Sequence, residues 1–215
     1  MSNSIQDMKE KIAYFMRRLY VQGLTTTSGG NISARLPDST VLITPSASDK
    51  AQMKGEEIGH MTMDGNIIGL HFKPSIESFM HLEIYKARPD VNSIVHAHPV
   101  HASAFAASKV KICSKYLAES YTILGEIAYP EYHRMGSMEL AMSVAASLKK
   151  TDCAIMRNHG AIAIGNSLLD AFDKLEVLEA AARITCINMG VLKDFAVELD
   201  EKELKEIDLF INRKI

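Results

Sequence analysis

The chain has 215 residues, of which 47% are apolar and 23% are charged, as expected for an ordinary globular protein with one sizeable core. Its formal net charge of -2 gives no reason to expect nucleic acid or an anionic membrane as a partner. The N-terminal segment interleaves charged and apolar residues, so we expect neither a signal peptide nor a membrane span, and we expect a cytoplasmic protein. No stretch resembles a linker, which predicts one domain over residues 1–215.

The first third of the chain predicts a helix followed by short strands. An apolar stripe in the first twenty residues indicates an amphipathic helix, with Ser4 as its cap and Gly23 just after its end. The segment TTTSGGNISAR is typical of a small-residue turn that enters a strand, and TVLITPS predicts a second strand ending at Pro45. The segment MTMDGNIIG predicts a hairpin, because Asp-Gly favours a tight turn.

The rest of the chain alternates predicted helices and strands. Ser75 is expected at or beside the cap of a helix over about residues 76–87, and CAIMRNHGAIAIG predicts two short strands about a turn at His159-Gly160. Ser167 and Asp170 form a predicted capping box for a long helix that Gly190 ends. We also expect a strand over residues 91–98 and helices over residues 137–149 and 200–210. Frequent hairpins between helices predict a mostly antiparallel sheet covered by helices.

A histidine cluster in the segment SIVHAHPVHAS is the first candidate for chemistry. On a strand, His96 and His98 point to the same face and lie about 7 Å apart along the strand, so both imidazoles can bind one metal ion. His101 lies beyond Pro99, out of that register, and is expected to support the site or to cap the next helix. Alone, this pattern fits a metal-binding pair and two packed core histidines equally well.

Two distant residues bear on that choice. His159 precedes a glycine at a strand end, where its side chain can reach a neighbouring strand and supply a third ligand. Taken alone, however, His159 is more simply interpreted as an ordinary histidine of a turn, without a functional role. Glu77, in the segment KPSIE, is expected in the first turn of a helix, where the dipole favours its carboxylate. Acidic residues are common there for stability alone, so a functional role requires Glu77 to face the metal.

Three short segments could bind an anion. The helix start at Ser75 offers free backbone N–H groups and a hydroxyl. The loop Ser28-Gly29-Gly30-Asn31 is rich in small residues and backbone amides, although a glycine-rich turn without an adjoining lysine motif is weak evidence. Ser46-Ala47, just after a predicted strand, could form a third wall.

Taken together and in this order, SGGNISAR, VLITPS, KPSIE, VHAHPVH and RNHG resemble the zinc-dependent class II aldolase family over residues 5–177. That family groups L-fuculose-1-phosphate aldolase with L-ribulose-5-phosphate 4-epimerase and the adducin head domain. The resemblance implies an α/β fold, a three-layer α/β/α sandwich around a largely antiparallel sheet. It also implies a homotetramer with active sites between subunits and one Zn²⁺ per subunit, for which Mn²⁺ or Co²⁺ could substitute.

The resemblance further implies a role for each candidate residue. His96, His98 and His159 would bind the metal, and Glu77 would be the acid/base and could also touch the metal. The implied phosphate pocket comprises Ser28, Gly30, Asn31, Ser46, Ala47 and Ser75. In the implied reaction, the metal stabilises the charge that appears when the C3–C4 bond of a ketose 1-phosphate breaks, and Glu77 moves a proton on the dihydroxyacetone phosphate fragment.

The sequence departs from the family pattern at two places. Ile76 follows Ser75 where the fuculose-phosphate enzymes have a second serine, which removes one hydroxyl from the implied phosphate site. The C-terminal segment DLFINRKI has no tyrosine, so Tyr132 or Tyr116 would have to act as proton donor.

Several functions remain open at this point. Glutamate at position 77 favours an aldolase over an epimerase, whereas methylthioribulose-1-phosphate dehydratase shares the zinc site. A non-catalytic adducin-like binding module would lack the histidine set. We therefore expect a lyase that cleaves a ketose 1-phosphate, with L-fuculose 1-phosphate, giving L-lactaldehyde, as the first candidate substrate.

Overall fold

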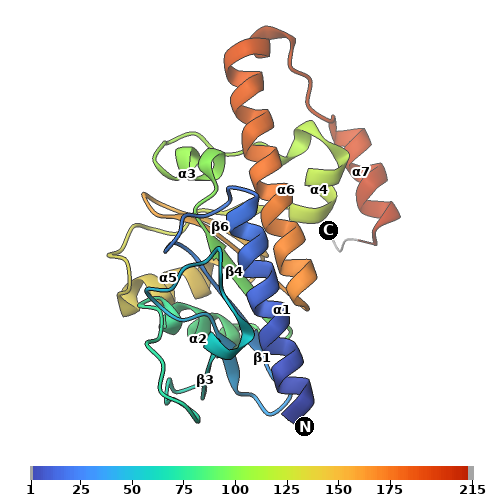
Figure 1. The fold of residues 1–215 in the computed structure, drawn as a ribbon. Helices are drawn as coiled ribbons and strands as arrows, with labels where there is room; N and C mark the ends of the chain where they lie inside the picture. Colours follow the sequence, from blue (N-terminus) through green and yellow to red (C-terminus); the bar gives the residue numbers. More distant parts are fainter. Residues whose placement is uncertain (1, 213–215) are drawn as a thin grey trace.

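The computed structural model describes residues 2–212 (Figure 1). It contains one sheet with the strand order β3-β2-β1-β4-β7-β6-β5. Every neighbouring pair is antiparallel except β5 and β6, which are parallel. This pairing confirms the largely antiparallel sheet. The strands are β1 (Asn31–Arg35), β2 (Val41–Ile43), β3 (Gly59–Met61), β4 (Ser93–Ala97), β5 (Ile127–Ala128), β6 (Cys153–Met156) and β7 (Gly160–Gly165).

Helices cover both faces of this sheet. They are α1 (Ser2–Val21), α2 (Ser78–Ala87), α3 (Val100–Ala106), α4 (Ala118–Leu124), α5 (Met138–Ser147), α6 (Leu168–Ile187) and α7 (Glu201–Phe210). Short 3-10 helices lie at Gly55–Glu57, Ser114–Tyr116 and Lys193–Phe195, and a π-helical turn at Asn188–Leu192. Within residues 2–212, no helix combines the length and the apolar character needed to cross a membrane.

Alternating side chains of each strand divide the core into two layers. In β4, Val95 and Ala97 pack with α1, α3 and α6, whereas Ile94 packs with α2 and α5 on the opposite face. Figure 1 shows α1 and α6 side by side over one face, and Arg18 of α1 forms an ion pair with Glu176 of α6 at 3.2 Å. The three-layer α/β/α sandwich is therefore confirmed.

The structure corrects several predicted boundaries in the first half of the chain. α1 begins before Ser4, so Ser4 is not its cap, whereas Gly23 follows its end with a φ of 70°. α2 begins at Ser78 rather than Ile76, which places Glu77 at the N-cap. The predicted hairpin after β3 forms its turn, but its second strand is reduced to a single bridge between Met61 and Ile67.

In the second half of the chain, the predicted helix starts at residues 137, 167 and 200 coincide with side-chain caps, of which the one at Ser167 was predicted as a cap. The side chains of Ser137, Ser167 and Asp200 accept hydrogen bonds from the first turns of α5, α6 and α7. The predicted capping box at α6 is only half formed, because the Asp170 carboxylate accepts from the backbone of Asn166 instead. α6 ends before Gly190, which the π-helical turn contains.

Candidate metal centre

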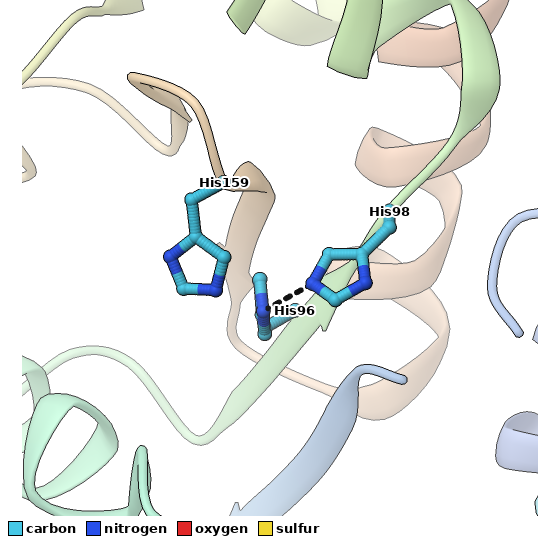
Figure 2. Close-up of side chains that lie close together, drawn as sticks. All are labelled: His96, His98 and His159. Carbon is cyan, nitrogen blue, oxygen red and sulfur yellow. Dashed lines mark hydrogen bonds between the residues drawn. The ribbon is translucent and has the colours of Figure 1, made fainter. Parts of the chain in front are cut away.

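β4 carries two of the histidines. His96 is fully buried, opposite Asn31 of β1 and Ile162 of β7, and it faces the α2/α5 side of the sheet as Ile94 does. His98 follows the end of β4 and is half-buried. The two rings lie 4.9 Å apart, and their Nε2 atoms approach to 3.2 Å (Figure 2). The shared face predicted for this pair is thus present, although the strand ends one residue earlier than expected.

The turn between β6 and β7 brings in His159. Its ring centroid lies 4.8 Å from that of His96 and 5.6 Å from that of His98. Each of the three histidines offers one nitrogen within 4.8 Å of the others. Gly160 permits this approach, because a Cβ atom there would lie 2.5 Å from Cδ2 of His98 and 2.6 Å from the carbonyl oxygen of Ala97.

The hydrogen bonding of the three imidazoles suits a divalent cation. His96 Nδ1 lies 2.9 Å from the carbonyl oxygen of Ala161, which can only accept, so Nδ1 carries hydrogen and a neutral His96 directs the Nε2 lone pair into the cluster. Both ring nitrogens of His159 are buried without a hydrogen bond. Buried nitrogens of this kind are costly unless something binds them. Three imidazoles are a common ligand set for zinc, and they also suit other transition metals.

Glu77 lies against this cluster from the N-cap of α2. Its Oε2 lies 3.2 Å from Nε2 of His96 and accepts a 2.8 Å hydrogen bond from Nδ2 of Asn31. Its Oε1 lies 2.7 Å from Nε2 of His159, but this contact lacks hydrogen-bond geometry. Burial raises the pKa of Glu77, yet the neighbouring His96 and His159 outweigh it and hold the pKa below its usual range. The carboxylate is therefore ionised and faces the position where the three histidines converge.

Part of the predicted phosphate pocket adjoins Glu77. Nδ2 of Asn31 also donates to Oγ of Ser75 over 3.2 Å, and the backbone N–H of Glu77 donates to the same oxygen. The segment with Ser46 runs beside this point, because its backbone N–H donates to the carbonyl of Lys73. Ala47 is exposed with a φ of 53°.

The other two predicted pocket residues lie on the loop before β1. Ser28 is exposed, and Gly30 is buried with a φ of 67°. A Cβ atom at Gly30 would lie 2.7 Å from the carbonyl oxygen of His96, so this glycine lets the loop pack directly on β4.

A buried lysine beneath the loop of residues 45–48 was not predicted. Lys50 is 1% exposed, and its Nζ donates to the carbonyl of Pro45 and to Oγ of Ser48. Its backbone N–H donates to the carbonyl of Thr27, which joins the loop of residues 45–48 to the loop before β1. Burial lowers the pKa of Lys50 to about 8.

The remaining candidates, two tyrosines and His101, lie at different distances from the histidine cluster. Tyr132 is 56% exposed, and its ring lies 6.0 Å from the guanidinium of Arg157, two residues before His159. Tyr116 lies elsewhere, in the electrostatic neighbourhood of Cys113 and Glu198. His101 is inside α3 and pairs with Glu179 of α6 at 2.7 Å, so it neither caps the helix nor joins the cluster.

Sequence reasoning missed the polar residues behind Glu77. His81 and Tyr85 are fully buried on α2, and both contact Ser33 of β1. Glu77, His81 and Tyr85 are spaced four residues apart, which places them along one helix face. Polar groups at this spacing were the one signal in the sequence, although apolar core positions of a helix recur with the same spacing.

Known proteins resemble this chain in sequence and in fold. Residues 10–186 match the family model described as Class II Aldolase and Adducin N-terminal domain. A protein of Methanocaldococcus jannaschii named L-fuculose phosphate aldolase is 35% identical over 185 residues, which cover 86% of this chain and 99% of that protein. A protein of Haemophilus influenzae named 3-oxo-tetronate 4-phosphate decarboxylase is 30% identical over 202 residues, covering 92% and 95%. A solved structure of an L-fuculose 1-phosphate aldolase superposes with a TM-score of 0.85 at 29% identity, covering 96% of each chain.

Proposed function

Because the chain belongs to the class II aldolase and adducin N-terminal domain family, we propose that it is a metal-dependent lyase acting on a sugar phosphate. The reaction that we propose first is reversible cleavage of a ketose 1-phosphate to dihydroxyacetone phosphate and a short aldehyde. L-fuculose 1-phosphate, giving L-lactaldehyde, is the first candidate substrate, since the Methanocaldococcus jannaschii relative carries that name. The observation that carries the proposal is the contact of one buried carboxylate, Glu77, with a cluster of three histidines.

His96, His98 and His159 would hold the cation, with Zn²⁺ proposed first and Mn²⁺ or Co²⁺ as alternatives. Such a cation, when bound, stabilises negative charge on a substrate carbonyl while the neighbouring carbon–carbon bond breaks. Three protein ligands leave room for substrate, as catalytic sites require. Glu77 is placed to move the proton on the dihydroxyacetone phosphate fragment, because it is ionised and within contact of two of these histidines.

For the substrate phosphate we propose a site between three segments. Oγ of Ser75 already accepts two hydrogen bonds, so its own O–H can donate to a phosphate oxygen. Asn31 and the backbone of residues 46–47 adjoin it, and Ser28 and Gly30 would complete the seat from the loop before β1. Ile76 is 55% exposed and adds no hydrogen bond, so the site is expected to bind phosphate with fewer donors than a double-serine site.

We further propose a homotetramer with the sites at subunit interfaces, acting in the cytoplasm. Apolar side chains near the site support an interface: Ile76 lies against Gly136, and Phe79, Met138 and Met142 on α2 and α5 are between 45% and 60% exposed. Tyr132, exposed in the segment before α5, is the proposed proton donor of this chain, and Tyr116 is the alternative if it reaches a neighbouring subunit.

A second candidate function is decarboxylation of a 3-oxo sugar-acid phosphate. The Haemophilus influenzae relative named for this reaction covers more of this chain than the aldolase-named relative does. In both reactions the bond that breaks joins the carbon adjacent to a ketone to the departing carbon. The negative charge develops on the adjacent carbon and is shared with the ketone oxygen. The same cation and the same carboxylate serve both, and the departing group, an aldehyde or carbon dioxide, distinguishes them.

The test is an assay of the zinc-loaded protein with several ketose 1-phosphates and 3-oxo-tetronate 4-phosphates, in which dihydroxyacetone phosphate and carbon dioxide are measured separately. Glu77→Gln should keep the zinc and lower kcat by about 100-fold or more. Glu83→Gln, on the same helix but paired with Lys86, is the matched control and should behave as wild type. Wild-type activity in Glu77→Gln would overturn the proposal, and carbon dioxide without aldehyde would favour the decarboxylase.

A further inference from the structure

A continuous chain of buried hydrogen bonds leads from the protein core to Glu77. Tyr85 OH lies 2.8 Å from Ser33 Oγ, and Ser33 Oγ lies 2.7 Å from His81 Nδ1. His81 Nε2 then lies 2.6 Å from Asn31 Oδ1, and Asn31 Nδ2 donates to Glu77 Oε2 over 2.8 Å. The four side chains before Glu77 are at most 3% exposed, so no solvent competes for these bonds.

The fold builds this chain from two facing elements. Asn31 and Ser33 are alternate residues of β1, so both point to the α2 side of the sheet. His81 and Tyr85 are one helical turn apart on α2 and point back at them. Strand and helix residues therefore alternate along this series of hydrogen bonds, which ties α2 to β1 from its N-cap to Tyr85.

The chemistry of the groups fixes the direction of each bond. Nδ2 of Asn31 lies 2.8 Å from Oε2 of Glu77 and 3.2 Å from Oγ of Ser75, so the nitrogen of the amide faces these two acceptors and its oxygen faces His81. A rotated amide would place two oxygen acceptors 2.8 Å apart. Since Asn31 Oδ1 can only accept, His81 Nε2 carries the hydrogen of the imidazole.

The remaining bonds follow from that tautomer. Burial is the main cause that lowers the pKa of His81, to about 3, so its ring is neutral and Nδ1 accepts from the Ser33 hydroxyl. The Ser33 oxygen then accepts from the Tyr85 hydroxyl, which stays protonated because burial raises the pKa of Tyr85. Each hydrogen in the chain has one position, which makes the arrangement rigid.

We propose that His81 is a positioning residue, which as the Nε2–H tautomer holds the Asn31 amide with its nitrogen toward Glu77 and Ser75. One amide nitrogen contacts both the proposed acid/base and the proposed phosphate seat, at 2.8 Å and 3.2 Å. His81 thereby fixes the position of Glu77 relative to the substrate. The catalytic part of this inference rests on the proposed function, whereas the tautomer and the orientation of Asn31 do not.

The first test is neutron diffraction from crystals of the deuterated, zinc-loaded protein. The expected result is deuterium on Nε2 of His81 and none on Nδ1, with the nitrogen of Asn31 facing Glu77. Deuterium on Nδ1 would overturn the proposal whatever reaction the protein performs. This measurement needs no variant, so it decides the question even if substitutions at His81 prevent folding.

The second test compares His81→Gln with His81→Asn. The glutamine side chain can place an N–H near the position of Nε2 and so keep the donor to Asn31. The shorter asparagine side chain reaches only the position of Nδ1, next to Ser33, and leaves Asn31 without that donor. We expect kcat/KM to fall by less than about tenfold in His81→Gln and by about 100-fold in His81→Asn, because a small misplacement of the reacting group is enough for such a loss. Zinc affinity should remain near wild type in both, because the three metal-binding histidines are unchanged.

Equal losses of kcat/KM in the two variants would show a merely structural role and overturn the proposal. If wild type cleaves none of the tested substrates, the proposed function fails, and crystal structures of the two variants then decide this inference separately. The Asn31 amide should keep its orientation in His81→Gln and rotate in His81→Asn. An unchanged amide in His81→Asn would overturn the positioning role.

Discussion

Asn31 lies directly opposite His96 across the neighbouring strands β1 and β4, so their side chains project from the same face of the sheet. Both reach the same oxygen of Glu77, at 2.8 Å and 3.2 Å. The register of two strands thus determines where the carboxylate of a helix N-cap sits. A change of charge at Asn31 should therefore act directly on Glu77.

Asn31→Asp tests this relationship. The new carboxylate would face Glu77 at hydrogen-bond distance, and two such charges cannot both remain ionised, so the pKa of one of the two acids should rise. We expect kcat/KM to fall by about 100-fold, measured by steady-state kinetics. Asn66→Asp, an exposed residue of the turn after β3, is the charge-matched control. Wild-type kinetics in Asn31→Asp would contradict the assignment of Glu77.

His98→Ala should remove the metal and leave the fold intact. Within residues 2–212, the hydrogen bond found for the half-buried side chain of His98 joins it to His96. After the substitution the buried His96 keeps its contacts with the carbonyl of Ala161 and with Glu77. Elemental analysis should find no zinc in this variant, while its thermal unfolding resembles that of the wild-type apoprotein. His101→Ala is the control, because His101 pairs with Glu179 outside the cluster and its variant should retain zinc. Zinc in His98→Ala at the wild-type ratio would refute the three-histidine centre.

Gly160→Ala should disturb the metal centre through packing alone. The added methyl group would lie 2.5 Å from the ring of His98 and 2.6 Å from backbone of β4, so β7 must move away. Overpacking of this kind destabilises by about 1–3 kcal/mol. We expect a lower free energy of unfolding in urea and weaker zinc binding by calorimetry. Gly190→Ala is the matched control, since no atom lies within 4 Å of a Cβ atom there.

Lys50 predicts a pH dependence of stability. Burial lowers its pKa to about 8, from 10.5, so between these values the unfolded chain binds more protons than the folded chain. The free energy of unfolding of wild type should therefore rise with pH through this window, by about 3 kcal/mol relative to Lys50→Met. Urea unfolding of both proteins at pH 7.5 and at pH 10.5 measures the difference. A difference that does not change with pH would mean that Lys50 keeps its charge when buried.

Features that arise from local chemistry were predictable. The side chains of Ser137, Ser167 and Asp200 cap helices because short polar side chains satisfy the free N–H groups of a first turn, and this depends on a few neighbouring residues. Alternation along β4 likewise predicted that His96 and His98 share a face. The family resemblance supplied the distant partners Glu77 and His159, which the local patterns alone left undecided.

Features that depend on tertiary contacts were not predictable in the same way. α3 and α4 have seven residues each, too few for a clear apolar period, and β5 has two residues and exists because it pairs with β6. His81 and Tyr85 lie in a helix whose spacing resembles that of ordinary core positions. Their role is visible only once Ser33 of β1 faces them.

The strand order of the sheet also has a consequence for synthesis of the protein. His96 and His98 emerge from the ribosome before His159 and before β7, which pairs with β4 only after the chain has turned back. A metal site rarely exists before the chain has folded, so we do not expect a nascent chain with only two of the three histidines to retain a cation. Long-range pairing of this kind is slow compared with helix formation. For the proposed metal centre we therefore expect loading to follow closure of the sheet, and a chain that stops before His159 to bind no metal there.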